Sequence, residues 1–502
     1  MMRRLTALPL TSMRRLMLLV VCLLSLQCSF AQIGIRKEAV EPHLPDSVDL
    51  EYYGKKNVWR PLAEIVGLNV GLWAYDKYIL KAPGAHVTAA SIRRNLVSGF
   101  KWDSDMLGTN NFLHPYHGGL YFNAARSNGY NFWQSELFAA AGSLSWELFG
   151  ECEYPSINDF ISTPIGGAVT GEVTFRASDA VLDDRTRGWQ RFGREFAAFL
   201  ISPMRGINRI VTGQAWRVRS TSGHLFGTPP FAFRASLGAK MLVYQKRFSK
   251  SGVGGSLQLD LEYSRRFEPT FKPYDYFTMR AELQMIKGQP LLSRLSVKGR
   301  LLGRNIYTGK HSSLSVGFYQ HYDYFDSDTI DALQKVPYKL GIPASVGAGG
   351  MFQHRSSDSW RFDCYLHANA VILAGILSDH YRTNKRNYNW ASGFSLKAGI
   401  NWVFNQRRSS LTVHNEFYRL FTFIGYKKET ILSRQDYRTL NVMGDKSECT
   451  FNVTEARFDT RIYRNLYASL VFENFARITH YRDFPDVATS SQTLRLMLSY
   501  KF

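Results

Sequence analysis

Four ionisable residues in the first half of the chain could do acid–base chemistry: His114, Glu147, Glu151 and Asp159. On a helix, Ser143, Glu147 and Glu151 would fall on one face. Carboxyl groups held side by side raise one another's pKa, which suits a general acid or base. His114 could act as a base or a ligand, with Asp159 orienting its ring. The pattern supports the hypothesis of a catalytic cluster in an envelope enzyme that hydrolyses a lipid or a glycan.

Structural roles fit the same region equally well. Glu172 and Arg176 are four residues apart, as in an ion pair along one helix. Ser156 and Asp159 resemble a capping box, with Asp in place of the usual Glu. His114, which precedes Pro115, could cap another helix. Both interpretations stay open from the residues alone.

Neither a metal nor a cofactor is predicted. His114 and His117 are three residues apart, but Pro115 lies between them and no clear third ligand follows. The chain has no Gly-rich phosphate loop, nucleophile elbow or zinc-protease helix. His367 and His414 suit an outer-membrane phospholipase by location only, since that chemistry needs a serine and a histidine that lipid can reach.

The candidate residues lie in a segment, 58–213, where apolar residues recur at helical spacing. One such run is Trp133, Leu137, Ala140, Leu144 and Leu148. Residues 157–180 are rich in small residues, which let helices approach closely. A further amphipathic stretch covers residues 189–201. We predict a helical domain at 58–213 that could plug or cap the remainder of the protein.

Short motifs between residues 110 and 176 resemble an uncharacterised family of Gram-negative envelope proteins, the domain of unknown function 3943. The motifs are Asn111-Phe112-Leu113-His114-Pro115-Tyr116, Ala125-Arg126-Ser127-Asn128-Gly129, Gly142-Ser143 with Trp146-Glu147, Glu151 with Pro155-Ser156-Ile157-Asn158-Asp159, and Gly166-Gly167 with Gly171-Glu172. The resemblance covers about residues 58–213. It implies outer-membrane association and no particular activity. We assign a binding or structural role to Asn111, Arg126, Asn128, Asn158, Glu172 and Arg176.

From about residue 231 onward, apolar and polar residues alternate, as in strands with one apolar and one polar face. The pattern recurs about twelve times between turn-rich gaps. Within 449–462 the apolar positions change parity between Val453 and Ala456, which predicts a β-bulge. Strands persist in lipid only within a closed barrel. We therefore predict an α+β protein with an antiparallel transmembrane β-barrel at 214–502 and an N-terminal helical domain.

The predicted inward rows of this barrel mix both signs of charge. Buried charges must be paired or solvated, which a water-filled pore or a polar plug would achieve equally. The residues are Asp260, Glu262, Arg280, Glu282, Arg294, Lys298, Arg300, Arg361, Asp363 and Lys397.

Both ends of the sequence favour export to the outer membrane. An apolar run at 16–26 follows two arginines and precedes small residues at 29–31, which predicts a cleaved signal peptide at 1–31. A lipid anchor at Cys28 is the alternative. Residues 32–57 read as a flexible periplasmic lead. The last ten residues, TLRLMLSYKF, resemble the closing strand of outer-membrane barrels, whose terminal Phe, here Phe502, helps mark the chain for insertion by the barrel assembly machinery.

The net charge limits the classes of partner, and the cysteine count limits the disulfide pairing. The formal net charge is +21, and removing the four arginines of residues 1–31 leaves +17. Export argues against nucleic acid, so the predicted partners are outer-membrane lipids and lipopolysaccharide, while a soluble ligand stays unknown. Cys152, Cys364 and Cys449 remain after cleavage, and an odd number excludes a fully paired framework. On the apolar face of its predicted strand, Cys364 is expected to be a small buried residue.

Three functions are compatible with this sequence. The first is a channel, transporter or structural barrel with a helical plug or cap, which we favour. The second is the envelope enzyme built on His114, Glu147, Glu151 and Asp159. The third is a membrane scaffold that binds periplasmic partners.

Overall fold

The computed structural model describes residues 56–502 except 104, 228, 245–246, 264–265, 268–271, 330–334, 357–358, 381–386, 432–433 and 435–443. The predicted signal peptide and nearly all of the predicted lead therefore lie outside the described residues. The helices and strands below belong to one structural unit, residues 46–501.

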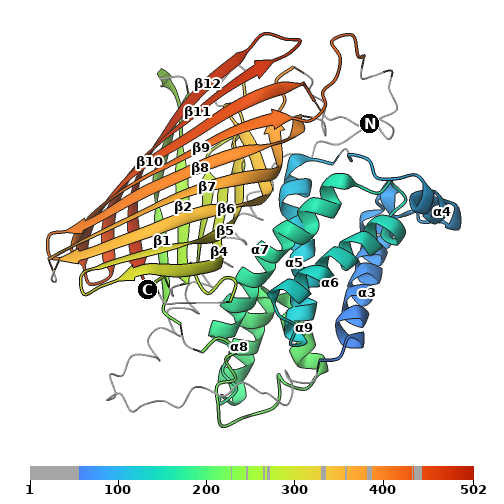
Figure 1. Cartoon of the computed structure of the whole chain (residues 1–502), viewed down its shortest axis with the longest axis horizontal. Helices are drawn as coiled ribbons and strands as arrows, with labels where there is room; N and C mark the ends of the chain where they lie inside the picture. Colours follow the sequence, from blue (N-terminus) through green and yellow to red (C-terminus); the bar gives the residue numbers. More distant parts are fainter. Residues whose placement is uncertain are drawn as a thin grey trace. The chain divides into compact units, whose positions relative to one another are not determined.

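Twelve strands in the described part of the chain close into an antiparallel barrel, in which β12 pairs with both β11 and β1 (Figure 1). The strands are β1 Phe231–Tyr244, β2 Arg247–Tyr263, β3 Phe277–Met285, β4 Leu292–Thr308, β5 Ser312–Asp326, β6 Lys339–Ser356, β7 Trp360–Leu377, β8 Tyr388–Phe404, β9 Ser409–Thr422, β10 Ser447–Tyr463, β11 Leu466–Tyr481 and β12 Val487–Lys501. Together with the helices that precede them, they confirm the predicted fold class.

The alternation of residue types sets which face of each strand points outward. In β12, Leu496 is 67% exposed and Leu498 is also exposed, whereas Arg495 before them and Ser499 after them are fully buried. Leu237 of β1 lies opposite Leu498 and is exposed as well. Apolar side chains outside and polar side chains inside are the arrangement of a transmembrane β-barrel.

The β-bulge predicted between Val453 and Ala456 is absent from this described stretch, because β10 pairs with β9 and β11 in continuous register there. The inward face of β10 instead changes from apolar residues, Phe451 and Val453, to charged ones, Glu455 and Arg457. The parity change reflects two layers inside the barrel rather than an extra residue.

The cysteines lie in unlike surroundings. Cys364 shares the outward face of β7 with Leu366 and is half-buried, so the prediction that it is a buried residue is wrong. Cys449 is buried on the inward face of β10. In the part of the chain that the structure describes, Cys152, Cys364 and Cys449 are all free thiols.

The helices precede the barrel in sequence. They are α3 Trp59–Ala74, α4 Ala89–Val97, α5 His114–Ser127, α6 Phe132–Ser145, α7 Ile157–Val181, α8 Gly188–Ile201 and α9 Pro203–Val211, with the π-helical turns η1 Tyr75–Leu80, η3 Thr109–Leu113 and η4 Trp146–Gly150 and the 3-10 turn η2 Pro83–Ala85. Proline at the first position of a helix is well tolerated, so Pro203 begins α9 rather than only ending α8. None of the described helices is both long and apolar enough to cross a bilayer.

The helices contact outward-facing side chains of the barrel. On β5, Gln320 donates to the Ile165 carbonyl at 2.9 Å, and the Tyr322 hydroxyl donates to the Asn111 carbonyl. The residues that alternate with them, His321 and Asp323, bond to inward-facing residues of other strands. In the described part of the chain the helices thus contact the outside of the barrel wall, whereas the sequence left a plug and a cap both open.

Small residues let α5 and α7 pack closely, as the sequence predicts. A Cβ atom on Gly118 would lie 1.7 Å from the Thr163 carbonyl oxygen, and one on Gly167 would lie 2.5 Å from the Gly118 carbonyl carbon. Both contacts are with backbone, which cannot move aside easily. The glycines therefore set the distance between the two helices.

We predict that Gly118→Ala destabilises the helices by about 1–3 kcal/mol through overpacking. The measurement is thermal unfolding in detergent micelles, followed by far-ultraviolet circular dichroism. The matched control is Gly67→Ala in α3, where nothing lies within 4 Å, and where alanine should stabilise the helix by up to about 1 kcal/mol. Equal effects at both positions would contradict the packing argument.

Candidate functional site

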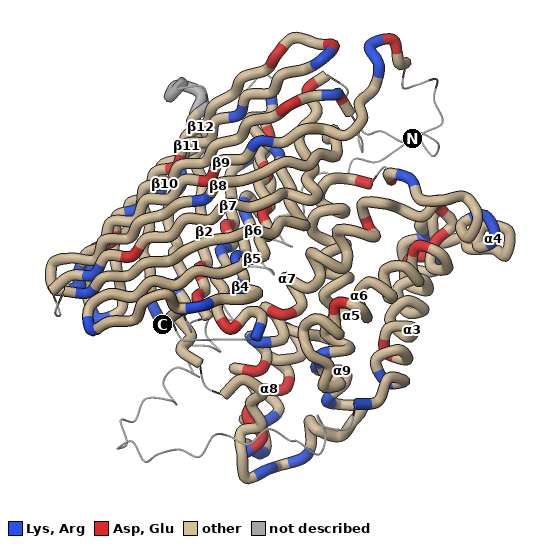
Figure 2. The backbone as a smooth tube through the Cα atoms, in the orientation of Figure 1, with Lys and Arg blue, Asp and Glu red and all other residues tan. Residues whose placement is uncertain are grey.

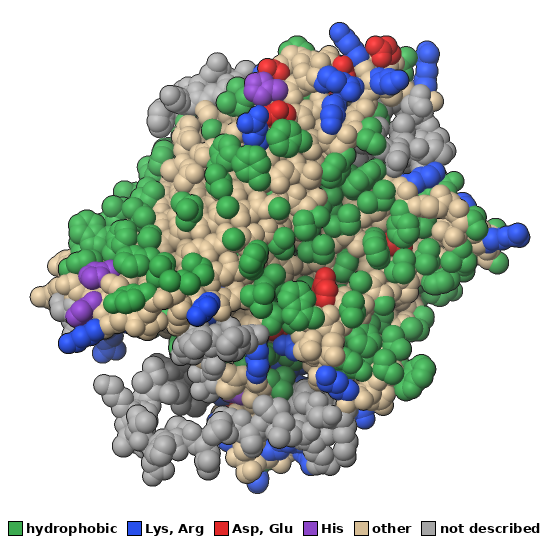
Figure 3. Space-filling model, in the orientation of Figure 1, with side chains coloured by type: hydrophobic (Ala, Val, Ile, Leu, Met, Phe, Trp, Pro, Cys, Tyr) green, Lys and Arg blue, Asp and Glu red, His purple; other side chains and the backbone are tan. Residues whose placement is uncertain are grey.

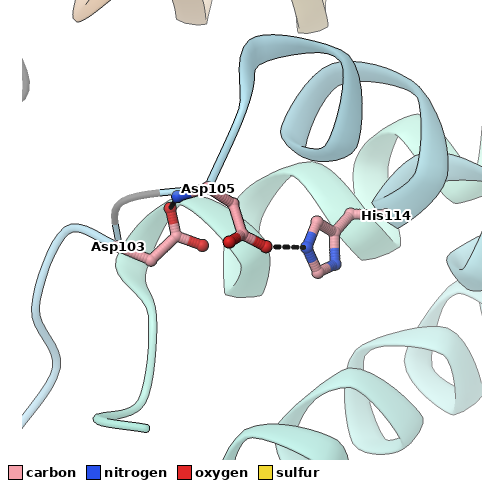
Figure 4. A group of neighbouring side chains, drawn as sticks. All are labelled: Asp103, Asp105 and His114. Carbon is pink, nitrogen blue, oxygen red and sulfur yellow. Dashed lines mark hydrogen bonds and ion pairs between the residues drawn. The ribbon is translucent and has the colours of Figure 1, made fainter. Parts of the chain in front are cut away.

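His114 lies among carboxylates at one end of the helical bundle (Figure 4). Its Nε2 atom is 3.5 Å from Asp159 Oδ1 and 3.9 Å from Asp105 Oδ2. Asp103 and Asp105 come from the loop before η3, and His114 is the first residue of α5. Asp159 belongs to the first turn of α7. The structure thus brings together His114 and Asp159, which the sequence analysis paired, and adds two aspartates that it missed.

Amide side chains fix the positions of these carboxylates. Asn110 Nδ2 donates to Asp103 Oδ1 at 2.8 Å, and Asn158 Nδ2 donates to Asp159 Oδ1 at 2.9 Å. Asn158 Oδ1 also accepts from the Asp103 backbone N–H at 3.1 Å. Asn110 reaches this position because the π-helical turn η3 precedes α5. Such turns recur at functional sites.

Glu147 has a structural bond rather than an open position. It is 1% exposed, and its Oε2 accepts from the Ser156 backbone N–H at 2.7 Å. Ser156 in turn caps α7, with its hydroxyl accepting from the Asp159 N–H at 3.2 Å. The predicted cap is therefore present, but Glu147 completes it in place of Asp159. Glu151 follows the last helical residue, Gly150, and does not continue the helical face predicted for it.

Few opposite charges balance this acidic cluster. Burial raises the pKa of Glu151 to about 8, and the nearby Asp105 adds to the effect. Burial also raises the pKa of Glu147, together with Glu151 and Asp159. Burial alone would lower the pKa of His114, but Asp159, Asp105 and Asp103 outweigh it and raise the pKa to about 10. The geometry therefore favours an imidazolium at neutral pH, which is not a general base.

Asp103, Asp105 and His114 are also spaced so that they could hold a metal ion. Their ligand atoms lie within 4.8 Å of one another, and the Asp105 side chain is 43% exposed. His117 does not join them, because its ring packs against Tyr121 and Trp146. His114 does not cap α5, since the helix continues directly from η3.

The remaining motif residues hold helices to one another and to the barrel. Glu172 accepts from Arg126 Nε at 2.7 Å and from Arg176 Nε at 2.8 Å, while Arg176 Nη2 donates to the Pro273 carbonyl at 2.8 Å. Arg176 thus ties α7 to the β2–β3 connection. Asn111 packs against Gly341 of β6, where a Cβ atom would lie 2.4 Å from the Asn111 Cγ. Asn128 Nδ2 donates to Glu64 of α3 at 3.1 Å.

Ion pairs fill the barrel lumen, linking strands that are not neighbours. Arg280 of β3 bonds to Glu455 of β10 at 2.5 Å, although β2, β1, β12 and β11 separate these strands in the sheet. Arg294 of β4 bonds to Glu416 of β9 at 3.0 Å. Basic and acidic residues lie along the same strands, as Figure 2 shows. Arg280 and Arg294 are among the inward-facing residues that the sequence predicts. Their partners Glu416 and Glu455 were missed, because β9 and β10 alternate weakly in sequence.

Two histidines considered for a phospholipase also point into this lumen. His367 Nδ1 is 3.0 Å from His321 Nε2, and His414 Nδ1 is 3.2 Å from the Tyr365 hydroxyl. Both histidines lie on inward rows and away from the lipid-facing surface, so the location-based suggestion is wrong.

One family model matches a stretch of the helical part. Residues 99–204 match the family described as Domain of unknown function (DUF3943), which confirms the resemblance found in the motifs. No curated protein matches the chain.

Solved structures similar to this chain include the NanC porin, at 7% identity and a TM-score of 0.26 over 53% of this chain and 100% of that chain. Another is the Pseudomonas putida toluene transporter TodX, at 7% identity and a TM-score of 0.22 over 55% of this chain and 90% of that chain. Similarities at these TM-scores do not bear on the function of this chain.

We predict that the helical part loses stability as the pH rises from 6.5 to about 10. His114 has an ordinary pKa of 6.5 and a raised pKa in the fold, so its contribution is complete below pH 6.5 and disappears as the pH approaches 10. The measurement is the unfolding midpoint of the helical circular dichroism signal against pH. His114→Gln should be less stable at pH 6.5 and should show a flatter profile. A variant profile parallel to that of the wild type would contradict the assignment.

We predict that Glu172→Gln destabilises the protein by about 3–5 kcal/mol, because it removes the buried carboxylate that Arg126 and Arg176 share. The measurement is urea unfolding in detergent micelles. Arg185→Gln is the control, since it breaks an ion pair whose arginine is 55% exposed and should cost no more than about 1 kcal/mol. If Glu172→Gln lowered the free energy of unfolding no more than Arg185→Gln does, the proposed structural role of Glu172 would be wrong.

Proposed function

We propose that this protein is an outer-membrane transport protein whose lumen is closed in the conformation described. One observation carries the proposal: a layer of paired charges crosses the lumen. A barrel with a purely structural role could fill the same space with apolar side chains at equal or better stability, because buried ion pairs rarely exceed well-packed apolar residues in net contribution. Charges that are kept inside suit a lumen that admits water and solute in another state.

The charged layer is densely connected. Arg495 of β12 bonds to Glu282 of β3 at 3.0 Å and to Glu473 of β11 at 3.0 Å. Lys397 of β8 pairs with Asp323 of β5, and all five of these residues are buried. Opening the lumen would exchange these pairs for water or for groups on a charged solute.

An apolar layer lies beside the charged one. Phe451 and Phe475 pack with Tyr338, whose ring stacks on Phe475 at a centroid distance of 4.5 Å. Tyr338 comes from the β5–β6 connection, and the carbonyl of its neighbour Pro337 accepts from Arg477 Nε at 3.1 Å. A connection that reaches into the lumen is a part that could move during transport.

The proposal also covers the orientation of the barrel in the outer membrane and the molecules that it contacts there. The turns β4–β5 and β10–β11 are short and lie at the same end as the start of β1, whereas β9 and β10 are joined through residues 423–446 at the other end. Short turns face the periplasm in bacterial barrels. The apolar outer face supports association with membrane lipids. We further propose that the protein contacts lipopolysaccharide. The barrel assembly machinery would insert the chain, with Phe502 as the insertion signal.

The test is ion conductance in planar bilayers. A variant with smaller side chains in both layers, combining Tyr338→Ala, Phe451→Ala, Arg280→Ser and Glu455→Ser, should conduct steadily. The wild type should show brief, voltage-dependent openings. Leu496→Ala on the lipid face is the control and should behave as the wild type. A wild type that never conducts, beside a variant that does, would mean a permanently closed barrel.

The His114 cluster offers a second candidate, an envelope hydrolase in which the imidazolium of His114 would act as a general acid. The cluster contacts Tyr388 at the start of β8, where the Tyr388 hydroxyl donates to the Asp105 carbonyl at 2.9 Å. This is the end of the barrel at which β9 and β10 are joined through residues 423–446. In a deletion strain with altered lipid A or phospholipid, the wild-type gene should restore the composition and His114→Gln should not. Restoration by His114→Gln would remove this candidate. Glu147→Gln tests folding instead, since Glu147 holds Ser156.

A further inference from the structure

Several outer helices have a polarity that is the reverse of that of helices in a water-soluble bundle. In α6, Leu137 is 71% exposed and Trp133 is exposed, whereas Ser135, Ser143 and the adjoining Glu147 of η4 are buried. The run of apolar residues that predicts this helix therefore faces outward. A soluble protein places such a run against its core.

Two further helices, α8 and α9, also expose apolar side chains and bury polar ones. On α8, Trp189, Phe192, Phe196 and Leu200 recur every three or four residues and are all exposed. The opposite side of this pair is charged and buried, with Arg191 bonded to Asp184 at 3.0 Å and Arg209 bonded to Glu195 at 2.8 Å. On α9, Ile207 and Ile210 are exposed and Arg205 and Asn208 are buried. Burying charges while exposing aromatics is costly in water and favourable in hydrocarbon.

The fourth helix with this surface, α3, has a length that matches a membrane. Its exposed residues from Val66 to Tyr75 are apolar or glycine. Arg60 lies before this stretch and Lys77 after it. At about 1.5 Å per residue these two cations are roughly 25 Å apart, close to the height of about 25 Å of the apolar band on outer-membrane barrels. Basic side chains at both ends of an apolar surface suit the two headgroup layers.

The apolar surface of the barrel continues directly into the helices. On the outward row of β5, Val316 and Phe318 are exposed, and the next two residues of that row, Gln320 and Tyr322, are covered by the helices. On the face drawn in Figure 3, hydrophobic side chains cover the strands and the helices alike, while most charged side chains lie toward the margins.

We propose that the exposed faces of α3, α6 and α8 contact the acyl chains of the membrane in which the barrel sits. The helical bundle is then a lipid-embedded companion of the barrel wall and not a periplasmic domain. Lipid is the occupant that fits, because the same reversal recurs on separate helices and joins a surface that is already lipid-facing. A protein partner or a second copy would need to cover all of these faces at once.

The test is nitroxide accessibility in the full-length chain, with its five native cysteines replaced. Single labels are placed at Val70→Cys, Leu137→Cys and Phe196→Cys, and the proteins are reconstituted in palmitoyl-oleoyl phosphatidylcholine vesicles. The lipid-facing control is Leu496→Cys on β12, and the water-facing control is Asn465→Cys in the β10–β11 turn. Three positions on separate helices keep the test valid if one variant fails to fold.

The inference requires that the three helix labels collide with oxygen as often as the Leu496→Cys label does, and with a water-soluble nickel complex several-fold less often than the Asn465→Cys label does. Collision with nickel at the level of Asn465→Cys would place the helices in water and overturn the inference. Low collision with both oxygen and nickel would mean that protein covers these faces, a partner or a second copy, and would overturn it as well. The outcome does not depend on whether the lumen conducts.

Discussion

The pairing of β1 with β12 is the constraint on which the remaining structure depends. In hydrocarbon an unpaired strand edge leaves its backbone N–H and C=O groups without partners, and each such group costs several kcal/mol. Closure between Arg234–Tyr244 and Ser491–Lys501 removes both edges at once. It also divides every strand into a lipid-facing row and a lumen-facing row. Charged side chains such as Arg495 can then be placed only inside, where they must find opposite charges.

The same rule organises the helices. Their backbone groups are satisfied internally. Their charged side chains turn inward and bond to one another, while apolar side chains cover the outer faces of α3, α6 and α8. Glu172 illustrates this arrangement, because it is fully buried and accepts from Arg126 at 2.7 Å and from Arg176 at 2.8 Å. Close contact at Gly118 and Gly167 adds to a buried apolar cluster that includes Phe122 and Val169. The barrel and the helices both pair their charged side chains in the interior and present apolar side chains on the outside.

Much of this architecture could be predicted from the sequence. The period of two in β12 and its recurrence about twelve times predict the barrel, and the glycines near Gly167 predict close helix packing. The side of the barrel on which the helices pack could not be predicted, because Gln320 and Tyr322 look like ordinary outward residues of β5. The parity change at Val453 was misread as a bulge, since a layered lumen and a bulge leave the same pattern.

The candidate site was predicted only in part, for a physical reason. His114 and Asp159 are 45 positions apart in the chain and meet because α5 and α7 cross closely. Asp103 and Asp105 lie in a short loop without periodicity, so nothing in the sequence linked them to His114. Glu147 looked catalytic because it is an acid beside other acids, yet it serves to hold the start of α7.

The central claim is that lipid surrounds the barrel and the helices together. Electron cryomicroscopy of the protein in lipid nanodiscs tests it most directly, because the lipid belt is visible at the edge of the protein. The account predicts lipid density against the exposed faces of α3, α6 and α8 as well as around the strands. Helices that project from the belt into water, with lipid against the strands alone, would contradict it.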